Sequence, residues 1–224
     1  MSKLILFYSP GACSLACHVA LLEWGVAFEA RRVMLAKGEH REPDFLALNP
    51  RARVPLLIID GQPVRENSGL LTWIGQQCGL YPPAGTLEAA ICGEWLGWLT
   101  STVHIAFALI WRGERFAQDQ ALHAALRQQG YDCVGEHFGE IEAALAQTPH
   151  AVSDQFSVVD CNLLPLYRWG HRIGLDMSKY PAWTAHTQKS LLRSSVRAAF
   201  AAEGIKIDDK LPLPEGVTPP PPHR

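Results

Sequence analysis

The chain has 224 residues, enough for one large or two modest domains with a hydrophobic core. Its 20 Lys and Arg residues against 22 Asp and Glu residues give a net charge of -2, so no basic excess points to nucleic acid as a partner. No stretch of roughly 18 uncharged apolar residues predicts a membrane span, and we expect a cytoplasmic protein without membrane contact. The six cysteines lack the spacing of a metal site or a disulfide scaffold and are expected to be free thiols.

The first 80 residues alternate between strand-like and helix-like segments. Short apolar runs are bounded by Pro, Gly and Asp, and an Asp-Gly pair at residues 60–61 predicts a hairpin turn. The expected strands are Leu4–Tyr8, Phe28–Met34, Leu56–Asp60 and Pro63–Arg65, and the expected helices are Ser14–Trp24 and Asn67–Cys78. A β-α-β unit followed by a β-β-α unit predicts an α/β layer architecture.

Strand signals end at a stiff, helix-breaking connection, Tyr81–Gly85. The domain boundary is expected here, with an α/β domain over residues 1–81, a linker over 82–86 and an all-helical domain over 87–207. Apolar residues of the second half recur at helical spacing. The expected helices run from about Leu87 to Arg115, Gln118 to Ala146, Val158 to Ile173 and Tyr180 to Ala202. The Pro-rich residues 208–224 predict neither helix nor central strand.

Two features of the second half are assigned to folding. Ser157 and Asp160 have the spacing of a capping box, in which the serine accepts from helix N–H groups and the acid bonds back. Trp95, Trp98, Leu99 and Thr102 form one stripe of the first long helix, which is typical of core.

Cys13 stands where the first strand passes through a Pro-Gly turn into a helix. The exposed N–H groups and the positive end of the helix dipole favour thiolate over thiol at such a position. Cys13 is therefore a candidate reactive thiol, expected to be alkylated faster than the other cysteines at neutral pH. The alternative is an inert apolar residue, as most free cysteines are. Cys17 is expected to be packed and inert, and Cys13, Cys17 and His18 lack a fourth metal ligand.

Two further segments have a structural and a functional interpretation. The Val54-Pro55 bond is either an ordinary trans bond at a strand start or a cis bond that exposes the Val54 backbone to an extended peptide. Glu66 and Asn67 begin a helix directly after a strand. They form either an ordinary helix start or a site for an amino-acid head group, with Glu66 on the ammonium and the Asn67 amide and helix N–H groups on the carboxylate.

Taken together, these segments resemble the glutathione transferase family, in particular its bacterial beta-type members. The resemblance covers residues 3 to about 205 and rests on the ordered set Tyr8–Leu15, Phe45–Pro50, Val54-Pro55, Glu66-Asn67 and Phe156–Asp160. It implies a thioredoxin-like N-terminal domain of order β-α-β-α-β-β-α that binds glutathione, and an all-helical C-terminal domain that binds a second substrate. It also implies a homodimer, with no metal.

The resemblance assigns roles to individual residues. Cys13 would meet the glutathione sulfur, and His104, in the long helix, would approach it and act as general acid toward a leaving group. Val54 and a cis Pro55 would pair with the cysteinyl part of glutathione, and Glu66 and Asn67 with its γ-glutamyl head. On its own, a helical histidine such as His104 is more often a structural residue.

The remaining contacts are less defined. Ala12 is expected in the glutathione site, and Lys37 or Arg53 is expected to bind the glycyl carboxylate or to face water. Many relatives have serine at the position of Asn67, and Ala52-Arg53 replaces a small residue and glycine. The expected pocket for the second substrate is lined by Phe107, Trp111 and Trp169.

The function expected from this pattern is a glutathione-dependent transferase acting on a hydrophobic electrophile, or thiol exchange through a mixed disulfide at Cys13. A cysteine donates a weaker hydrogen bond than serine or tyrosine, which favours reductase or lyase chemistry. The alternatives are a non-catalytic module of the same fold that binds a ligand or a protein, and an isomerase of the maleylacetoacetate type. The turn before Cys13 matches the isomerase poorly.

Overall fold

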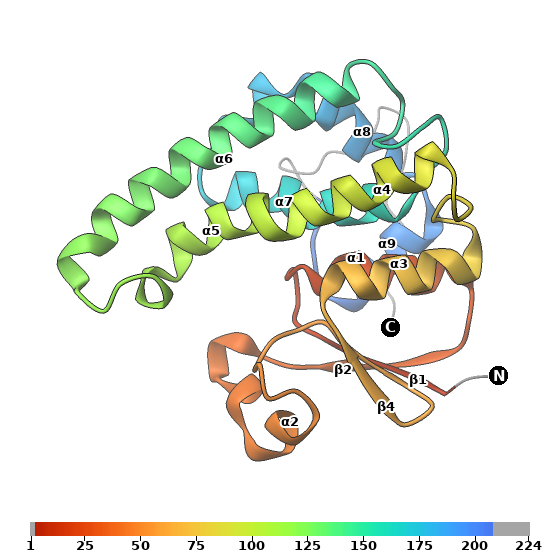
Figure 1. The fold of residues 1–224 in the computed structure, drawn as a ribbon, viewed down its shortest axis with the longest axis horizontal. Coiled ribbons are helices and arrows are strands. Elements are labelled where there is room, and N and C mark those ends of the chain that lie inside the picture. Colours follow the sequence, from red (N-terminus) through yellow and green to blue (C-terminus); the bar gives the residue numbers. More distant parts are fainter. Residues whose placement is uncertain (1–2, 208–224) are drawn as a thin grey trace.

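The computed structural model describes residues 3–207, and Figure 1 shows a small sheet covered by layers of helices. The N-terminal part contains β1 (Leu4–Tyr8), α1 (Ser14–Trp24), β2 (Phe28–Arg32), α2 (Pro43–Leu48), β3 (Leu56–Ile59), β4 (Gln62–Arg65) and α3 (Asn67–Cys78). The C-terminal part contains α4 (Leu87–Trp98), α5 (His104–Trp111), α6 (His123–Leu145), α7 (Val158–Arg172), α8 (Pro181–Leu191) and α9 (Ser194–Ala202). The Pro-rich segment 208–224 lies outside the described residues. No helix of the described chain is both long and apolar enough to cross a membrane.

The sheet is mixed, with strand order β2-β1-β3-β4. The pair β1 and β2 is parallel, and β3 runs antiparallel to both β1 and β4. Successive side chains of a strand point to opposite faces, and both faces of β1 are buried. Leu4 and Leu6 face the main core with α1 and α3, whereas Ile5 and Phe7 face a smaller cluster that Phe45 of α2 completes.

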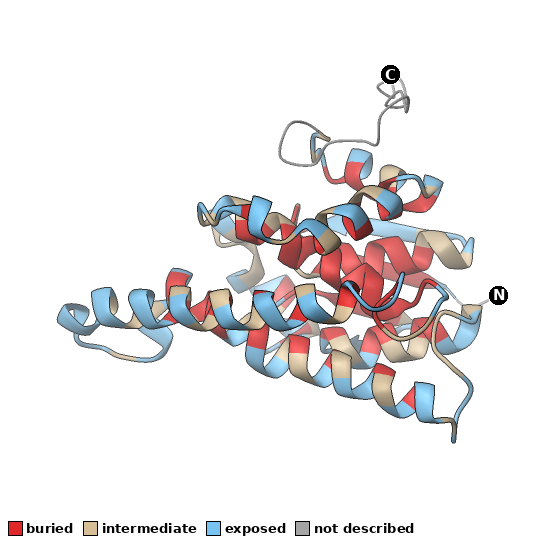
Figure 2. Ribbon diagram, turned by 90° about the horizontal axis from the view of Figure 1, so that it is seen from above, coloured by how far each residue is buried: buried red, intermediate tan, exposed pale blue. Residues whose placement is uncertain are grey.

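The main core is continuous between the two parts of the chain. Most residues of α7 are buried. At the start of this helix, the Val158 N–H donates to the Leu80 carbonyl at 3.0 Å. In Figure 2 the buried residues gather in the middle of the molecule, while the long helical hairpin that projects to one side is mostly exposed. The glutathione-transferase-type arrangement expected from the sequence, a thioredoxin-like domain followed by a helical domain, is confirmed.

The prediction of one helix from Leu87 to Arg115 is wrong. A π-helical turn over Leu99–Val103 separates α4 from α5, and α5 ends at Trp111 because Arg112 leaves the helical conformation with φ -138°. The Thr100 hydroxyl donates to the Leu96 carbonyl at 2.6 Å, a side-chain bond that competes with the regular helix pattern. An inserted residue rotates all that follows by about 100°. Thr102 is therefore exposed rather than in the core stripe.

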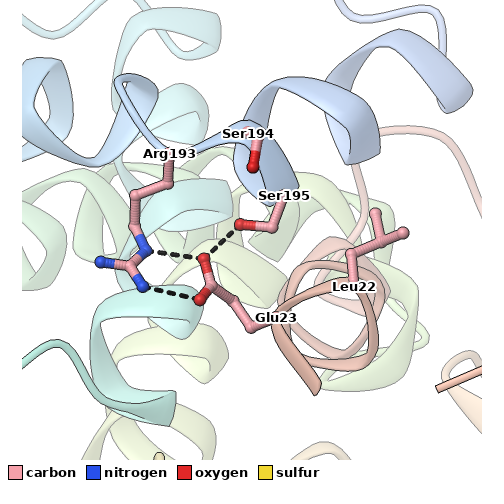
Figure 3. A pocket seen from close by; sticks show the side chains of 5 residues that line it. All are labelled: Leu22, Glu23, Arg193, Ser194 and Ser195. Atoms are coloured by element: carbon pink, nitrogen blue, oxygen red, sulfur yellow. Dashed lines mark hydrogen bonds and ion pairs between the residues drawn. The ribbon is translucent and has the colours of Figure 1, made fainter. Parts of the chain in front are cut away.

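The predicted helix from Tyr180 to Ala202 is also interrupted. Arg193 adopts an extended conformation between α8 and α9, and its guanidinium bonds both carboxylate oxygens of Glu23 at 2.6 Å. Ser195 also donates to Glu23. Figure 3 shows these side chains lining a pocket between α1 and α9. Burial would raise the pKa of Glu23, but the hydrogen bonds from Arg193 and Ser195 outweigh it and lower that pKa. The helix break thus places a cation against the N-terminal domain. The helix α6 begins at His123, later than the predicted Gln118, because residues 118–122 form a turn and a short 3-10 segment.

The capping box at the start of α7 is confirmed, and it has two partners that the sequence did not indicate. Asp160 accepts from the Ser157 N–H at 2.7 Å and from the His186 Nε2 at 2.7 Å, and the His150 Nδ1 lies 3.3 Å away. Burial alone would raise the pKa of Asp160. The hydrogen bonds from His150 and His186 prevail and hold that pKa well below its usual range.

We expect Asp160→Asn to lower the free energy of unfolding by about 3 kcal/mol at pH 7, because it breaks a buried, paired charge. The folded-state pKa is depressed, so this contribution is present above the unfolded pKa of about 4 and is lost as the pH falls below it. Urea unfolding over a pH series measures it, with the exposed Asp154→Asn as the matched control. A difference from wild type below about 1 kcal/mol at pH 7 would contradict the assignment.

Candidate active site

Cys13 lies at the start of α1, as the sequence predicts, and is partly exposed. Its thiol donates to the Val54 carbonyl across a distance of 3.6 Å between Sγ and O. Gly11, with φ 68°, forms the turn before it, and a methyl group there would approach the Arg168 guanidinium to 2.5 Å. The turn therefore favours glycine because of its backbone angle.

The surroundings of Cys13 do not favour the activated thiolate that the sequence predicts. Burial raises the pKa of the Cys13 thiol to about 12. The N–H groups of Cys13 and Ser14 lower that pKa, as the helix position suggests, but the carboxylates of Glu203 and Glu66 raise it further. Cys13 is consequently a thiol with a hydrogen to donate at neutral pH.

A second segment, Val54 and Pro55, lies beside Cys13. Their peptide bond is cis, and the β3 ladder begins only at Leu56. The Val54 backbone is thus outside the sheet pairing and next to Cys13.

Glu66 caps α3 and is exposed, with the unusual φ of 72°. Its carboxylate accepts from the Arg51 guanidinium at 2.6 Å, an ion pair that sequence analysis did not find. A non-glycine residue with positive φ is strained, and such strain is typical of functional positions. Glu66 therefore presents a carboxylate at the surface beside the start of a helix.

Asn67 does not point toward a head group. Its amide donates to the Asn162 side chain at 2.9 Å and its oxygen accepts from the buried Cys17 thiol at 3.3 Å. The side chain bridges the two parts of the molecule, so a carboxylate at this place would depend on the helix N–H groups. Cys17 is packed and buried, as expected.

His104 is connected to the turn before Cys13 through Trp169. The rings of His104 and Trp169 meet edge to face at 5.0 Å, and the Trp169 indole donates to the Gly11 carbonyl at 2.9 Å. Burial lowers the pKa of His104 to about 4, and the positive charges of Arg53 and Arg115 lower it further. His104 is neutral at pH 7, so it has one ring N–H to donate.

The three predicted pocket residues lie together, but only one of them presents a surface. Phe107 stacks on Trp111 at 5.2 Å and meets Trp169 at the same distance. Phe107 is fully buried and Trp169 is 5% exposed, whereas Trp111 is 38% exposed. Phe107 and Trp169 thus form the floor behind Trp111.

The candidate residues for a glycyl carboxylate belong to the N-terminal part of the chain. Lys37 and Arg53 are both exposed, and Ala12 is partly buried against the small cluster beneath the sheet. Arg53 is near enough to His104 to lower its pKa. The structure therefore places Arg53 toward the site and Lys37 in a cleft beside it.

Sequence reasoning missed Glu203, which lies at the C-terminal end of α9. Its carboxylate accepts from the Gly11 N–H at 2.8 Å and contacts the His18 Nδ1 at 3.0 Å, with none of its side chain exposed. A single acid after an alanine-rich helix gives no local signal for such a contact. The pairing also removes His18 from any metal site with Cys13 and Cys17.

One group within residues 3–207 has the composition of a metal site, namely His150, Asp160 and His186, whose ligand atoms lie within 4.8 Å of one another. Asp160 already accepts bonds from the Ser157 and Ala151 backbone on its two oxygens. Asp160 therefore belongs to a helix cap at the start of α7, remote in sequence from the Cys13 turn.

A mixed four-stranded sheet with a cysteine at the start of the first helix, next to a cis-proline, defines a thioredoxin-like domain, here fused to an all-helical one. Residues 2–68 match the glutathione S-transferase N-terminal domain and residues 124–189 the C-terminal domain. Glutathione S-transferase GST-4.5 of Xanthomonas campestris is 29% identical over 203 residues, covering 89% of this chain and 98% of that protein.

Solved structures of glutathione transferases are also similar to this chain. A sphingomonad glutathione S-transferase complexed with glutathione is 36% identical, covers 90% of this chain and 100% of its own, and has a TM-score of 0.80. A glutathione transferase homologue from Sulfitobacter with bound glutathione is 30% identical, covers 92% and 100%, and has a TM-score of 0.85. A beta-class enzyme of Sphingomonas chungbukensis is 36% identical, covers 90% and 100%, and has a TM-score of 0.81. The chain belongs to the glutathione S-transferase family, a family of transferase enzymes, as the resemblance predicted.

The raised pKa of Cys13 reverses the order of alkylation expected from the sequence. At pH 7.5 iodoacetamide should label the partly exposed Cys133 before Cys13, and labelling of Cys13 should rise about tenfold for each pH unit between 8 and 10, because only the thiolate reacts. Peptide mass spectrometry follows both sites. Rapid, pH-independent labelling of Cys13 at pH 7.5 would restore the activated-thiolate interpretation.

Proposed function

We propose that the protein is a glutathione-dependent transferase that conjugates glutathione to an electrophile, with Cys13 acting as a thiol that donates a hydrogen bond to the glutathione sulfur. The observation that carries the proposal is the position of the Cys13 thiol. It is partly exposed at a helix start and lies next to the Val54 backbone, which is outside the strand pairing. Relatives that match the whole described chain were crystallised with glutathione.

Each part of glutathione has a counterpart in the chain. The exposed Glu66 carboxylate and the N–H groups at the start of α3 suit the ammonium and carboxylate of the γ-glutamyl head. The Val54 backbone suits the cysteinyl amide, and Arg53 or Lys37 the glycyl carboxylate. On binding, the ammonium would compete with Arg51 for Glu66.

The reaction follows from these positions. The glutathione thiol loses its proton to solvent, and its sulfur attacks the electrophile to form a carbon–sulfur bond while the leaving group departs with its electron pair. A thiolate is stabilised by donors, here the Cys13 S–H and the N–H groups at the start of α1. A neutral His104 has an N–H to donate to the leaving group.

Thiol exchange is the second candidate function. It requires Cys13 itself to attack as a thiolate, which its raised pKa disfavours. A non-catalytic binding module would share the glutathione site but lack turnover. We also propose a two-fold homodimer, on the strength of the family resemblance.

Calorimetric titration of reduced glutathione tests the binding site. We expect micromolar to low-millimolar binding that Glu66→Gln weakens about 10-fold or more, since a charge-assisted hydrogen bond contributes about 1.5–3 kcal/mol. Glu136→Gln, an exposed position on α6, is the matched control and should bind as wild type does. A folded wild-type protein that shows no heat of binding would refute the proposed function.

Two substitutions at Cys13 separate conjugation from thiol exchange. If Cys13 donates a hydrogen bond, Cys13→Ser should keep or raise the conjugation rate, while Cys13→Ala should lower it about 10-fold or more. If Cys13 forms a mixed disulfide, both variants lose all thiol exchange. Steady-state rates with an aryl chloride and with a glutathione mixed disulfide distinguish the two, and an unchanged conjugation rate in Cys13→Ala would contradict the donor role.

A further inference from the structure

A cleft of about 370 Å³ opens between the N-terminal domain and the end of α5. One wall is the loop before α2, around Lys37 and Arg41, and the other is the segment after α5, with Arg112 and Arg115. In Figure 1 the two segments lie on the same side of the molecule, the second at the end of the hairpin that α5 and α6 form. Trp111, the residue before Arg112, is exposed at the end of α5.

The charges of this cleft are almost all positive. Lys37, Arg41, Arg112 and Arg115 line it, together with His40, and Glu114 is the single carboxylate among the lining residues. Within the described part of the chain, none of these four cations makes an ion pair. Other arginines of the same protein are paired: Arg31, Arg51 and Arg193 each contact a glutamate. The cleft thus holds four cations and one carboxylate, Glu114, which acts on Arg115.

This positive potential extends to the reaction site. Burial lowers the pKa of Arg115, and so do Arg53 and Arg112. Burial also lowers the pKa of His40, with Arg41, Arg112 and Arg115 adding to the effect. Arg53 and Arg115 act on His104 in the same direction. The groups therefore lie close enough to repel one another's charge, and an anion among them would relieve that repulsion.

Glutathione does not account for all of these cations. It carries two carboxylates and one ammonium, and its γ-glutamyl head is assigned to Glu66 and α3. Its glycyl carboxylate needs one cation, and Arg53 or Lys37, both in the N-terminal domain, supplies it. Arg112 and Arg115 belong to the other domain, on the side of Trp111, where the second substrate is expected.

We propose that the electrophile of this enzyme is an anion, an unsaturated or aromatic compound with a carboxylate group that binds Arg112 and Arg115 while its apolar part lies against Trp111. This inference rests on the proposed function and names its substrate class. Guanidinium groups bind carboxylates through paired N–H donors, and an exposed indole suits a planar ring. In the reaction the glutathione sulfur bonds to the electrophilic carbon, the leaving group departs with its electron pair, and the carboxylate is unchanged.

Two glutathione conjugates that differ by one carboxylate test the proposal without requiring turnover. The probes are S-(2,6-dinitrophenyl)glutathione and S-(4-carboxy-2,6-dinitrophenyl)glutathione, titrated calorimetrically at low ionic strength. We expect wild type to bind the carboxylated conjugate about 10-fold more tightly, the effect of one charge-assisted contact. The double variant Arg112→Gln, Arg115→Gln should lose this preference, and Lys189→Gln, an exposed position on α8, should keep it.

The possible outcomes are distinguishable. Equal affinity of wild type for the two conjugates, with normal glutathione binding, would overturn the anionic substrate class and leave the proposed function intact. If the double variant weakens glutathione and both conjugates by the same factor, the arginines hold the glycyl carboxylate and the proposal is also overturned. If neither glutathione nor a conjugate binds, the proposed function itself fails.

Discussion

The buried carboxylate of Glu203 is the interaction on which the site depends. It accepts the Gly11 N–H and contacts His18, so one side chain from the end of α9 fixes both the turn before Cys13 and the helix that follows it. Such a buried charge is tolerable only because it has these partners. Trp169 holds the same turn from the other side through the Gly11 carbonyl. Both polar groups of the Gly11 backbone are thus satisfied by the helical domain.

Burial has the largest effect on the pKa of Cys13, and Glu203 adds to it. The helix start supplies N–H groups that stabilise a thiolate, yet burial and the nearby Glu203 carboxylate act in the opposite direction and prevail. The arrangement suits a hydrogen-bond donor better than a nucleophile. The pKa of His104 is lowered, since burial and the surrounding arginines keep the ring neutral. The site therefore contains two neutral donors within a positively charged rim.

Local sequence signals predicted the N-terminal domain closely, because its elements are short and bounded by turn residues. The helix Ser14–Trp24 and the helix Asn67–Cys78 were predicted at their observed bounds. Three kinds of feature could not be predicted. The π turn at Leu99–Val103 arises where Thr100 bonds back to the helix, and the break at Arg193 arises from its pairing with Glu23, distant in sequence. Side-chain direction was the third, as Asn67 shows by bonding to Asn162 rather than facing outward.

The position of Glu203 has a consequence for how the chain acquires its structure during synthesis. Gly11 and Glu203 are 192 residues apart, so the turn that carries Cys13 leaves the ribosome well before its carboxylate partner does. Contacts of such long sequence separation form late because closing the intervening loop is entropically costly. An N-terminal domain that emerges alone has an unsatisfied Gly11 N–H and an exposed face of α1. Completion of the candidate active site is therefore coupled to the synthesis of α9.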